Sequence, residues 1–365
     1  MHQVEQKRLV KNEDIVYSTV RPNQEHYGYI KTPKDNLVVS TGFTVIENNK
    51  EISSSKYLYF FLTQQRVTSE LQQIAEHSTS TYPSIKPSNL EDMKLFLPLL
   101  DEQKSIADIL VSFDDKIELL RAQNKTLETL AQTLFKEWFV KFNFPNATGE
   151  MINSELGQIP KGWRVFRLNE LIDTINGYSY KGKELVENSN EALVTLKSFN
   201  RNGGFQTRGF KPFEGNPKST QEVVIGDLIV AHTDLTQDAE VLGNPAFVFE
   251  SGGFDKMYIT MDLVKVTSKV DNIDSAFLYY VMKDRKFKGH CIGYSNGTTV
   301  LHLSKKAIPE YEIALPEDLK LAEKFSKIAL STTDKISNNI LQIQSLEKTR
   351  DALLPKLMSG NVRVN

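Results

Sequence analysis

The sequence predicts an α+β fold in which two strand-rich regions are each followed by a long helix. Short β-branched and aromatic runs, separated by Gly, Asn, Asp and Pro, fill residues 1–99 and 160–316. The stretch that follows each region is almost free of Pro and Gly, as a long helix requires. The phrase LPLLDEQKSIADILVSFDDKI at 97–117 also returns as LPEDLKLAEKFSKIALSTTDKI at 315–336. A strand end and a helix start that occur together twice predict a duplicated module.

The repeat extends in both directions from this phrase. KYLYFF at 56–61 resembles AFLYYV at 276–281, and the two phrases are preceded by HSTSTYPSI and YSNGTTVLHL. The first copy has no counterpart to the segment from Pro160 to the basic loop near Lys211. Either this domain is naturally abbreviated, or the chain lacks the front of the original gene.

We therefore predict six segments along the chain. They are a first domain that lacks its N-terminal part (1–99), a first spacer helix (100–142), a linker (143–159), a second domain (160–316), a second spacer helix (317–359) and a C-terminal tail (360–365).

The strands are predicted from runs that end at Gly, Asn, Asp or Pro. In the second domain they are WRVFRL, EALVTL, DLIVAH, AFVFE, YITMDLVKV and YEIALP, with a helix at about 274–288 among them. In the first domain the equivalents are DIVYSTV, LVVSTGFTVI and MKLFLP, with a helix near 55–75.

The two long helices carry apolar residues at alternating spacings of four and three, which is typical of a coiled-coil seam. We expect the helices to pair as an antiparallel coiled coil. Asn124 and Asn339 interrupt the two rows. Each either fixes the register of the pair or points sideways to solvent. The residues predicted to pair the helices are Phe113, Ile117, Leu120, Asn124, Leu127, Leu134 and Trp138 on the first, and Ile336, Asn339, Ile343, Leu346, Leu353 and Leu357 on the second.

Composition excludes several classes of protein. The chain has 365 residues and a net charge of -2, so it is not coated with positive charge, although a local basic face is compatible with this value. No stretch approaches the ~20 apolar residues of a membrane span, and the start has no apolar core that resembles a signal peptide. Cys291 is the only cysteine, which rules out an intrachain disulfide and a multi-cysteine zinc site. A reducing compartment such as a bacterial or archaeal cytoplasm fits.

No sequence motif indicates catalysis. The chain has no Asn/Asp-Pro-Pro-aromatic motif for base methylation, no glycine-rich cofactor loop and no Gly-Lys-Ser/Thr phosphate loop. The histidines His77, His232, His290 and His302 are dispersed, which favours a surface or structural role for each over a metal site. The sequence therefore predicts a binding protein that is not an enzyme.

Several of these motifs resemble the specificity subunit of type I restriction–modification enzymes. The opening of the first helix has Leu97-Pro98, Glu102-Gln103 and Ile106-Ala107, which is similar to the conserved helices of that family. PKGWRVFRLNELIDTINGYS at 160–179 looks like the start of a target-recognition domain, and LEKTRDALLPKLMSGNVRV at 346–364 looks like the C-terminal signature. In the second copy Lys320-Leu321 replaces Glu-Gln, and the first domain departs from the family in its missing front.

The resemblance implies a non-catalytic subunit that recognises a bipartite site in double-stranded DNA through two domains held apart by paired helices. It also implies two modification (methyltransferase) subunits and restriction/translocase subunits as partners. S-adenosylmethionine, ATP and Mg are then expected on those partners, and this chain is expected to bind no cofactor or metal.

Loop residues able to reach base edges or phosphates are the predicted DNA contacts. The strongest charge signal is the loop at 197–218, which has five basic residues and the single acid Glu214. The alternative for this run is a solvated loop. The predicted contacts are Ser18, Thr19, Arg21, Ser78, Thr79, Ser80, Thr81, Gly177, Tyr178, Ser179, Tyr180, Lys181, Lys197, Asn200, Arg201, Asn202, Arg208, Thr233, Asn296, Gly297, Thr298 and Thr299.

Two other functions compete with DNA recognition. One is a non-catalytic coiled-coil adaptor whose β domains bind protein partners. The other is a fragment of a self-contained methyltransferase, which the missing catalytic motifs disfavour. Salt dependence separates the first from DNA binding, because counterion release makes DNA binding weaken steeply with added salt.

Overall fold

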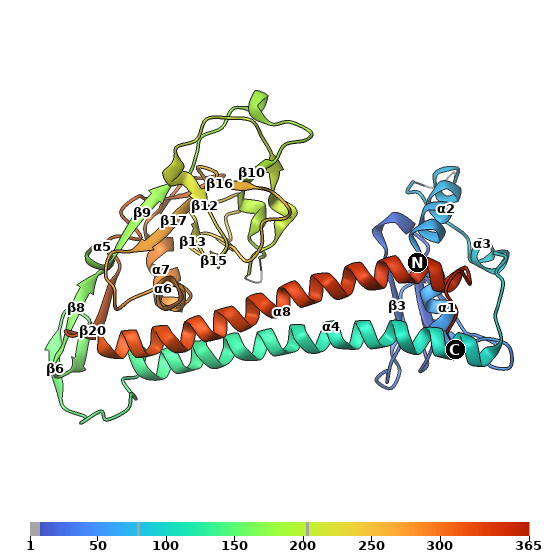
Figure 1. Ribbon diagram of the computed structural model, residues 1–365, viewed down its shortest axis with the longest axis horizontal. Helices are drawn as coiled ribbons and strands as arrows, with labels where there is room; N and C mark the ends of the chain where they lie inside the picture. Colours follow the sequence, from blue (N-terminus) through green and yellow to red (C-terminus); the bar gives the residue numbers. More distant parts are fainter. Residues whose placement is uncertain (1–7, 79–80, 202–203, 365) are drawn as a thin grey trace, which may run out of the picture. The chain divides into compact units, whose positions relative to one another are not determined.

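The computed structural model describes residues 8–78, 81–201 and 204–364 (Figure 1). The chain splits into two compact units. Unit 1 consists of Met1–Arg121 and Leu341–Asn365, and unit 2 consists of Ala122–Ile340. The long helices α4 (Leu100–Phe135) and α8 (Lys320–Met358) contribute residues to both units.

Unit 1 contains a small antiparallel sheet of order β3-β2-β5 and a separate pair β1-β4. Every residue of β2 is buried, and Ile15 and Tyr17 pack against Val67 and Leu71 of α2. The elements are β1 (Arg8–Leu9), β2 (Ile15–Ser18), η1 (Pro22–Gln24), β3 (Tyr27–Tyr29), β4 (Val38–Val39), β5 (Phe43–Ile46), α1 (Ser55–Leu62), α2 (Gln65–Glu76) and α3 (Pro87–Glu91).

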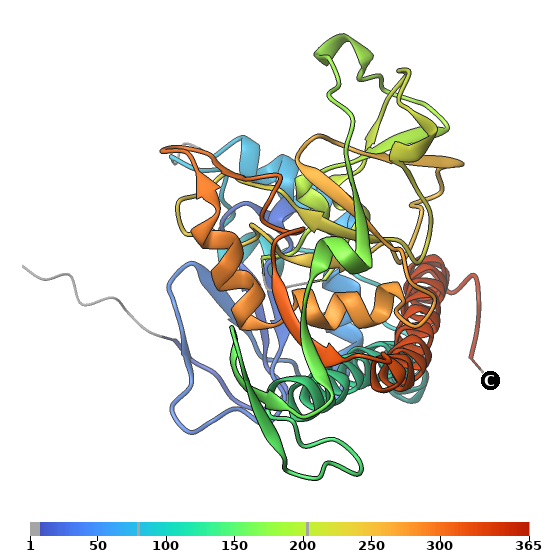
Figure 2. The same cartoon turned by 90° about the vertical axis from the view of Figure 1, so that its left-hand side faces the viewer.

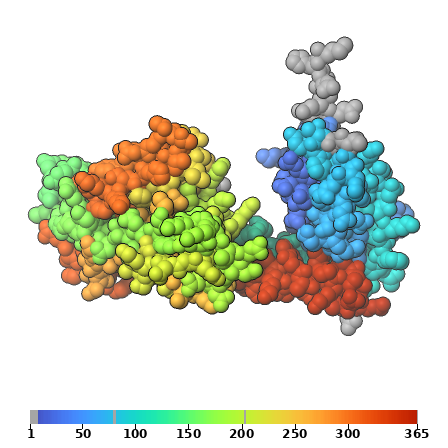
Figure 3. All heavy atoms as spheres, turned by 90° about the horizontal axis from the view of Figure 1, so that it is seen from above, coloured from blue at the N-terminus to red at the C-terminus, as the bar shows by residue number. Residues whose placement is uncertain are grey.

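A second cluster in unit 1 joins α1 to the beginning of α4 and the end of α8. Tyr57 and Phe60 of α1 pack with Leu110 of α4 and Leu357 of α8. Figure 3 shows this part of α8, in red, along the N-terminal elements, in blue to cyan. Gln103 of α4 is fully buried. Its side chain donates to the carbonyls of Ile52 (3.0 Å) and Pro98 (2.9 Å) and accepts from the N–H of Ser54 (2.9 Å), which explains the glutamine of the Glu-Gln pair.

Unit 2 is built from two four-stranded sheets, of order β11-β10-β16-β12 and β15-β13-β17-β9, and three smaller ones. The smaller sheets are β14-β19-β18, β20-β8 and β6-β7. The strands are β6 (Met151–Ser154), β7 (Gly157–Pro160), β8 (Trp163–Arg167), β9 (Ile172–Asn176), β10 (Glu191–Val194), β11 (Lys211–Pro212), β12 (Glu222–Val223), β13 (Leu228–Ala231), β14 (Thr233–Asp234), β15 (Pro245–Phe247), β16 (Lys256–Ile259), β17 (Leu263–Ser268), β18 (Ser295–Asn296), β19 (Leu301–Leu303) and β20 (Glu312–Pro316).

The helices of unit 2 form its main core against one of these sheets. Between α5 (Leu168–Leu171) and α8, the chain forms α6 (Ser275–Met282) and α7 (Arg285–Gly293), drawn in orange in Figure 2. All residues of α6 except Ser275 are buried. Phe277 of α6 meets Phe135 and Phe325 edge to face, at ring-centroid distances of 5.9 and 6.0 Å. This aromatic packing joins α6 to both long helices within unit 2.

The two units contain the same three-stranded arrangement in the same register, which confirms the repeat at the level of strand pairing. In unit 1, Ile15 pairs with Ile46 and with Tyr29. In unit 2, Leu228 pairs with Val266 and with Phe247. The next three pairs between β2 and β5 match those between β13 and β17 in order, ending at Ser18–Phe43 and Ala231–Leu263.

Contacts between the long helices are present within each unit. In unit 1, Ile117 and Leu120 of α4 cluster with Ile343 and Leu346 of α8, and Arg350 binds Asp114 at 2.6 Å. In unit 2, the buried Asn339 donates from Nδ2 to Oδ1 of Asn124 at 2.7 Å, so Asn339 does not point to solvent. All thirteen residues predicted to pair the helices are buried or half-buried.

Several local predictions were wrong. The run YITMDLVKV forms two strands, β16 and β17, separated by a turn, because its halves belong to different sheets. Each domain's single predicted helix is two helices, and the predicted linker contains the hairpin β6-β7. MKLFLP at 93–98 forms no strand, since no strand of the described residues pairs with it.

The ends of the long helices lie close to the predicted positions. A π-helix, Lys136–Val140, follows α4 directly, and α8 continues through Pro355 to Met358.

None of the helices in the described part of the chain has the length and apolar character of a membrane span. The same residues contain no cluster of His, Cys, Asp or Glu that could hold a metal ion.

Candidate nucleic-acid interface

The basic loop of unit 2 lies on one side of a pocket of about 480 Å³. The loop is held by its own backbone: the N–H of Gln206 donates to the Ser198 carbonyl at 2.9 Å, and the N–H of Asn200 donates to the Gly204 carbonyl at 3.0 Å. Four of the predicted contacts line the pocket, namely Lys197, Asn200, Arg201 and Arg208. The fold therefore gathers side chains that hydrogen-bond to bases and phosphates at one place.

The opposite side of this pocket is the loop 234–241, which is fixed by one buried carboxylate. Asp234 accepts hydrogen bonds from the N–H and hydroxyl of Thr236, both at 2.9 Å, and from the N–H groups of Val241 (2.7 Å) and Leu242 (3.2 Å). Burial by itself would raise the pKa of Asp234, but these hydrogen bonds outweigh it and hold the pKa below its usual value. The loop is thus anchored by an ionised side chain.

The Ser/Thr loop of unit 2, residues 295–299, contacts the same loop 234–241. Nε2 of Gln237 donates to the carbonyl of Thr298 at 2.6 Å. Asn296, Gly297, Thr298 and Thr299 are all exposed. Gly297 has φ 123°, and a Cβ there would lie 2.0 Å from the Val300 carbonyl oxygen, so this turn requires glycine.

The two arginines of the pocket differ in their availability. Nε of Arg201 lies 3.2 Å from Oε2 of Glu240, an ion pair across the pocket. Arg208 is exposed and forms no hydrogen bond or ion pair with any residue that the structure describes. Arg208 is therefore free to bind an incoming anion, whereas Arg201 must first leave Glu240 or share its charge with it.

The predicted turn at 177–181 has a structural role in part. A Cβ on Gly177 would lie 2.0 Å from the Thr260 carbonyl oxygen, so the glycine is needed for close packing of the chain on itself. Tyr178 donates its hydroxyl proton to Glu184 at 2.9 Å, and Tyr180 accepts a bond from Nζ of Lys211 at 3.4 Å. Ser179 and Lys181 are exposed, and they are the side chains of this turn available to a ligand.

In unit 1 some predicted contacts form hydrogen bonds within the fold, and others are exposed. Thr19 donates from Oγ1 to the Gly42 carbonyl at 3.0 Å, and Ser78 accepts a bond from the Ser84 N–H at 3.3 Å. Arg21 is exposed, and its guanidinium lies over the ring of Tyr82 at 4.7 Å from the centroid. Thr81 is also exposed.

Two predicted contacts are buried, and three lie outside the described residues. Ser18 bonds to the carbonyl and N–H of Val20, and Thr233 lies in strand β14 with its hydroxyl 3.4 Å from Nδ1 of His302. Both side chains are used inside the fold, so they are not surface contacts in this conformation. Thr79, Ser80 and Asn202 are the residues outside the described part.

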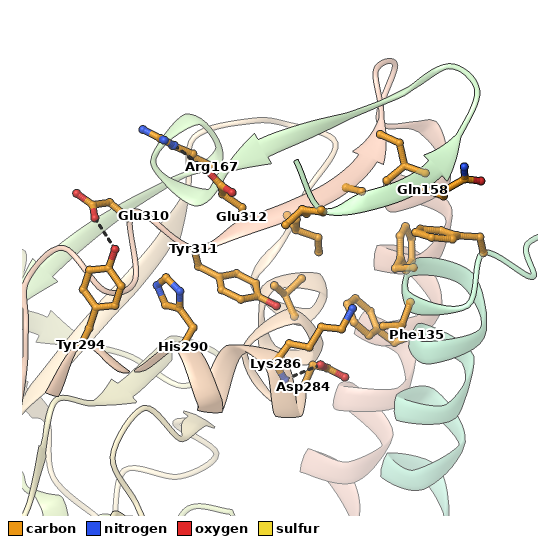
Figure 4. Close-up of a pocket in the computed structure, with 18 residues that line it drawn as sticks. Phe135, Gln158, Arg167, Asp284, Lys286, His290, Tyr294, Glu310, Tyr311 and Glu312 are labelled. Atoms are coloured by element: carbon orange, nitrogen blue, oxygen red, sulfur yellow. Dashed lines mark hydrogen bonds and ion pairs between the residues drawn. The ribbon is translucent and has the colours of Figure 1, made fainter. Parts of the chain in front are cut away.

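A larger pocket of unit 2, about 820 Å³, is elsewhere (Figure 4). Its floor is aromatic, with Phe135 and Tyr311 among the residues that line it, and none of the predicted DNA contacts lines it. Two of its acidic side chains pair with other lining residues: Glu312 with Arg167 at 3.2 Å, and Glu310 with the Tyr294 hydroxyl at 2.9 Å. His290 stacks on Tyr294, and its Nε2 lies 2.8 Å from the Ala307 carbonyl oxygen, which is a structural role, one of the two roles predicted for the histidines.

The prediction from sequence missed the loop 234–241 as a part of this interface. Gln237 and Glu240 bind the two predicted loops, and Leu235 is exposed beside them. The available signal was the repeat: Asp234 lies three residues after the end of β13, as the predicted contact Arg21 lies three residues after the end of the equivalent strand β2. Its polar composition alone gave no reason to prefer it over other loops.

The comparisons identify the family. The family model of the type I restriction modification DNA specificity domain matches residues 3–129 and 160–345. The type I restriction enzyme MjaIX specificity subunit of Methanocaldococcus jannaschii is 30% identical, over 92% of this chain and 76% of that subunit. The HindI specificity subunit of Haemophilus influenzae is 26% identical, over 98% of this chain and 88% of that subunit.

A solved structure shows the same fold. The crystal structure of the type I restriction–modification S subunit from M. genitalium matches with a TM-score of 0.59 at 16% identity, over 96% of this chain and 84% of that one. Because the family model covers most of the sequence, the chain belongs to the family of type I restriction modification DNA specificity domains.

Proposed function

We propose that this chain is the non-catalytic subunit that gives a type I restriction–modification complex its DNA sequence specificity. The observation that carries the proposal for unit 2 is the pocket between the loops 197–208 and 234–241. Exposed cations there stand beside amide and hydroxyl groups, the combination that binds phosphates and base edges together. Membership of the DNA specificity family supports the same conclusion.

Arg208 is the proposed principal DNA contact in unit 2. Its replacement by alanine should weaken binding to cognate DNA by about 1–3 kcal/mol. If Arg208 touches a base, specificity should relax at one position, whereas a phosphate contact should be lost equally on all sequences. Arg201→Ala should have a smaller effect, because Arg201 already pairs with Glu240.

The binding experiment needs the cognate sequence and a matched control. Sequencing of the positions methylated by this chain with its methyltransferase partner supplies the sequence. Arg164→Ala removes an equal charge from strand β8, outside the pocket, and should leave affinity unchanged. Unchanged affinity for both Arg208→Ala and Arg201→Ala at moderate salt would remove this loop from the interface. Binding that does not weaken with added salt would favour the adaptor that binds proteins.

We further propose that α4 and α8 form one antiparallel coiled coil that sets the distance between two half-sites. The contacts within the units support it, because Asp114–Arg350 and Asn124–Asn339 run in opposite directions along the two sequences. Deleting residues 121–127 and 340–346 removes one heptad from each helix and shortens the pair by about 10 Å, or roughly three base pairs. The variant should lose methylation of the original site and recover it only with a shorter gap. Full activity on the original spacing would show that the partners set the geometry.

The chemistry belongs to the partners in this proposal. Two modification subunits would bring S-adenosylmethionine, and restriction/translocase subunits would bring ATP and Mg. The complex would act on DNA in the cytoplasm of a bacterium or archaeon. Mixing experiments test this division: the chain alone should neither methylate nor cleave DNA, and methylation should appear when the modification subunit is added.

A further inference from the structure

Two side chains of opposite charge lie side by side in the pocket of unit 2. Nε of Arg201 lies 3.2 Å from Oε2 of Glu240, and both residues line the pocket. Their side chains are 73% and 37% exposed, so an incoming molecule can reach both. An ion pair this exposed contributes only about 0–1 kcal/mol to stability, so the fold gains little from it.

The backbone of Glu240 is held at both ends of one peptide unit. Its carbonyl accepts hydrogen bonds from Nζ of Lys288 at 3.2 Å and from Nδ2 of Asn244 at 3.0 Å. The N–H of the same peptide unit belongs to Val241, and it donates to Asp234 at 2.7 Å. The scaffold therefore fixes the point from which the side chain of Glu240 extends toward Arg201.

The residue before Glu240 has a backbone conformation that is unfavourable for its type. Ala239 has φ 50°, in the left-handed region, which costs roughly 1–2 kcal/mol for a residue with a Cβ. Ala239 is buried and packs in the main core of unit 2, and this packing holds the turn. The carboxylate of Glu240 is thus placed by the scaffold before any ligand arrives.

The major-groove edge of a C·G base pair has the arrangement that complements this ion pair. Cytosine presents its amino group N4 as a donor, and guanine presents O6 and N7 as acceptors. N4 and O6 hydrogen-bond to each other, so they lie about 3 Å apart, close to the separation of the two groups in the ion pair. A phosphate would fit this place poorly, because the carboxylate of Glu240 would repel it.

We propose that Arg201 and Glu240 together read one C·G base pair in the major groove. Glu240 accepts a hydrogen bond from N4 of cytosine, and the terminal nitrogens of Arg201 donate to O6 and N7 of guanine. Nε of Arg201 stays beside Glu240, so neither charge is left unpaired. An A·T pair does not satisfy both side chains, because its two major-groove acceptors lie on different bases. The inference rests on the proposed recognition of DNA by unit 2.

Sequencing of the positions methylated by this chain with its methyltransferase partner tests the role of Glu240. Glu240→Ala should lower the preference for one C·G pair of the recognised site by about tenfold or more. Its binding to unrelated DNA should not weaken, since the variant loses a negative charge, whereas a merely structural role would weaken binding to every sequence. Asp238→Ala is the matched control: it removes an equal charge from an exposed residue of the same loop that does not line the pocket, and it should keep the original specificity. Unchanged specificity in Glu240→Ala, or relaxation at an A·T pair instead, would overturn the inference.

Modified bases at the relaxed position test the role of Arg201. Replacing its guanine with 7-deazaguanine removes the N7 acceptor and should weaken binding of the original chain about fivefold, but should change binding of Arg201→Ala by less than about twofold. Inosine at the same place removes only the minor-groove amino group and should leave the binding of both chains unchanged. An equal loss with 7-deazaguanine in both chains would contradict the proposed contact. If these tests fail while Arg208→Ala still weakens binding, the inference alone is wrong, whereas a lack of salt-dependent DNA binding would also remove the proposed function.

Discussion

Unit 1 and unit 2 share a three-stranded centre, but unit 2 contains further strands around it. Both place a buried central strand, β2 or β13, between two antiparallel neighbours in one register. Unit 2 also contains β8, β9 and β10 and packs α6, α7 and both long helices into a large core, whereas unit 1 packs α1, α2 and the helix ends into smaller clusters. The comparison teaches that the three-stranded centre and the two helices that follow it are the part that both repeats share.

The first way to test this comparison is to remove a ring from the core of unit 2. Phe325→Ala should cost about 3–5 kcal/mol, because this buried ring meets five other aromatic rings within unit 2. Urea unfolding followed by hydrogen exchange should show the loss in unit 2. Leu330→Ala, at an exposed position of α8, is the control and should change stability by less than about 0.5 kcal/mol. Equal losses in both units would mean that they unfold together.

The second test exchanges a residue that the copies do not share. Gln103 satisfies three backbone groups in unit 1, and the equivalent residue in the second repeat is Leu321. Gln103→Leu leaves those three groups without their partner, so it should destabilise unit 1 by about 3 kcal/mol, at about 1 kcal/mol for each part-buried group left unpaired. The reciprocal Leu321→Gln should cost less than about 1 kcal/mol, since Leu321 is only partly buried. Similar costs in thermal unfolding would refute this difference.

The third test concerns Asp234 and its equivalent Arg21. Asp234→Asn should destabilise unit 2 by about 1.5–3 kcal/mol, because the carboxylate accepts four hydrogen bonds. Arg21→Ala should cost less than about 1 kcal/mol, since it removes an exposed cation–π contact.

The pH dependence of stability shows whether the charge of Asp234 stabilises unit 2. The pKa of Asp234 is lowered in the folded chain, so its contribution is present above the unfolded pKa of about 4. It is lost as the pH falls through the folded pKa. The difference between the original chain and Asp234→Asn should therefore be full at pH 7 and shrink below pH ~4 in urea titrations. A difference that is constant over this range would exclude the charge as the cause.

The smallest expected effect concerns the two asparagines between the long helices. Replacing Asn124 and Asn339 with leucine should stabilise unit 2 by at most about 1 kcal/mol, because an apolar pair avoids burial of the amides. The double variant should also lose its single register or form oligomers, as coiled coils do without a polar pair. Light scattering and thermal unfolding measure both effects. Strong destabilisation would show that the amides support the fold itself.

Most of the fold could be predicted from local patterns in the sequence. The β-branched and aromatic runs predicted β2, β8, β10, β13, β15 and β20, each of which has at least two buried residues. The apolar residues that recur every seven positions predicted both long helices, because such a helix buries one face. The failure at 93–98 has a different cause, since a strand needs a neighbour and no pattern in MKLFLP reports whether the neighbour exists.

The candidate site was predictable only in part. The charge excess at 197–211 located one side of the pocket, and the repeat located the Ser/Thr loop. The loop 234–241 was missed because its position depends on the buried hydrogen bonds of Asp234, which join residues seven and eight positions apart in a segment of ordinary composition. The burial of Thr233 and Ser18 could not be predicted either, since a hydroxyl residue at a strand end can face the core or the solvent.

The anchoring of the loop 234–241 separates the residues that keep its fold constant from the exposed residues that are free to vary. Its course is set by backbone N–H groups bound to one carboxylate and by the buried Ala239, so it does not depend on the exposed side chains of Gln237, Asp238 and Glu240. Residues such as Gln237 and Glu240 can then be exchanged during evolution at little expense to folding. A recognition protein built in this way can acquire a new target by substitution in the loop, while Asp234 keeps the scaffold constant.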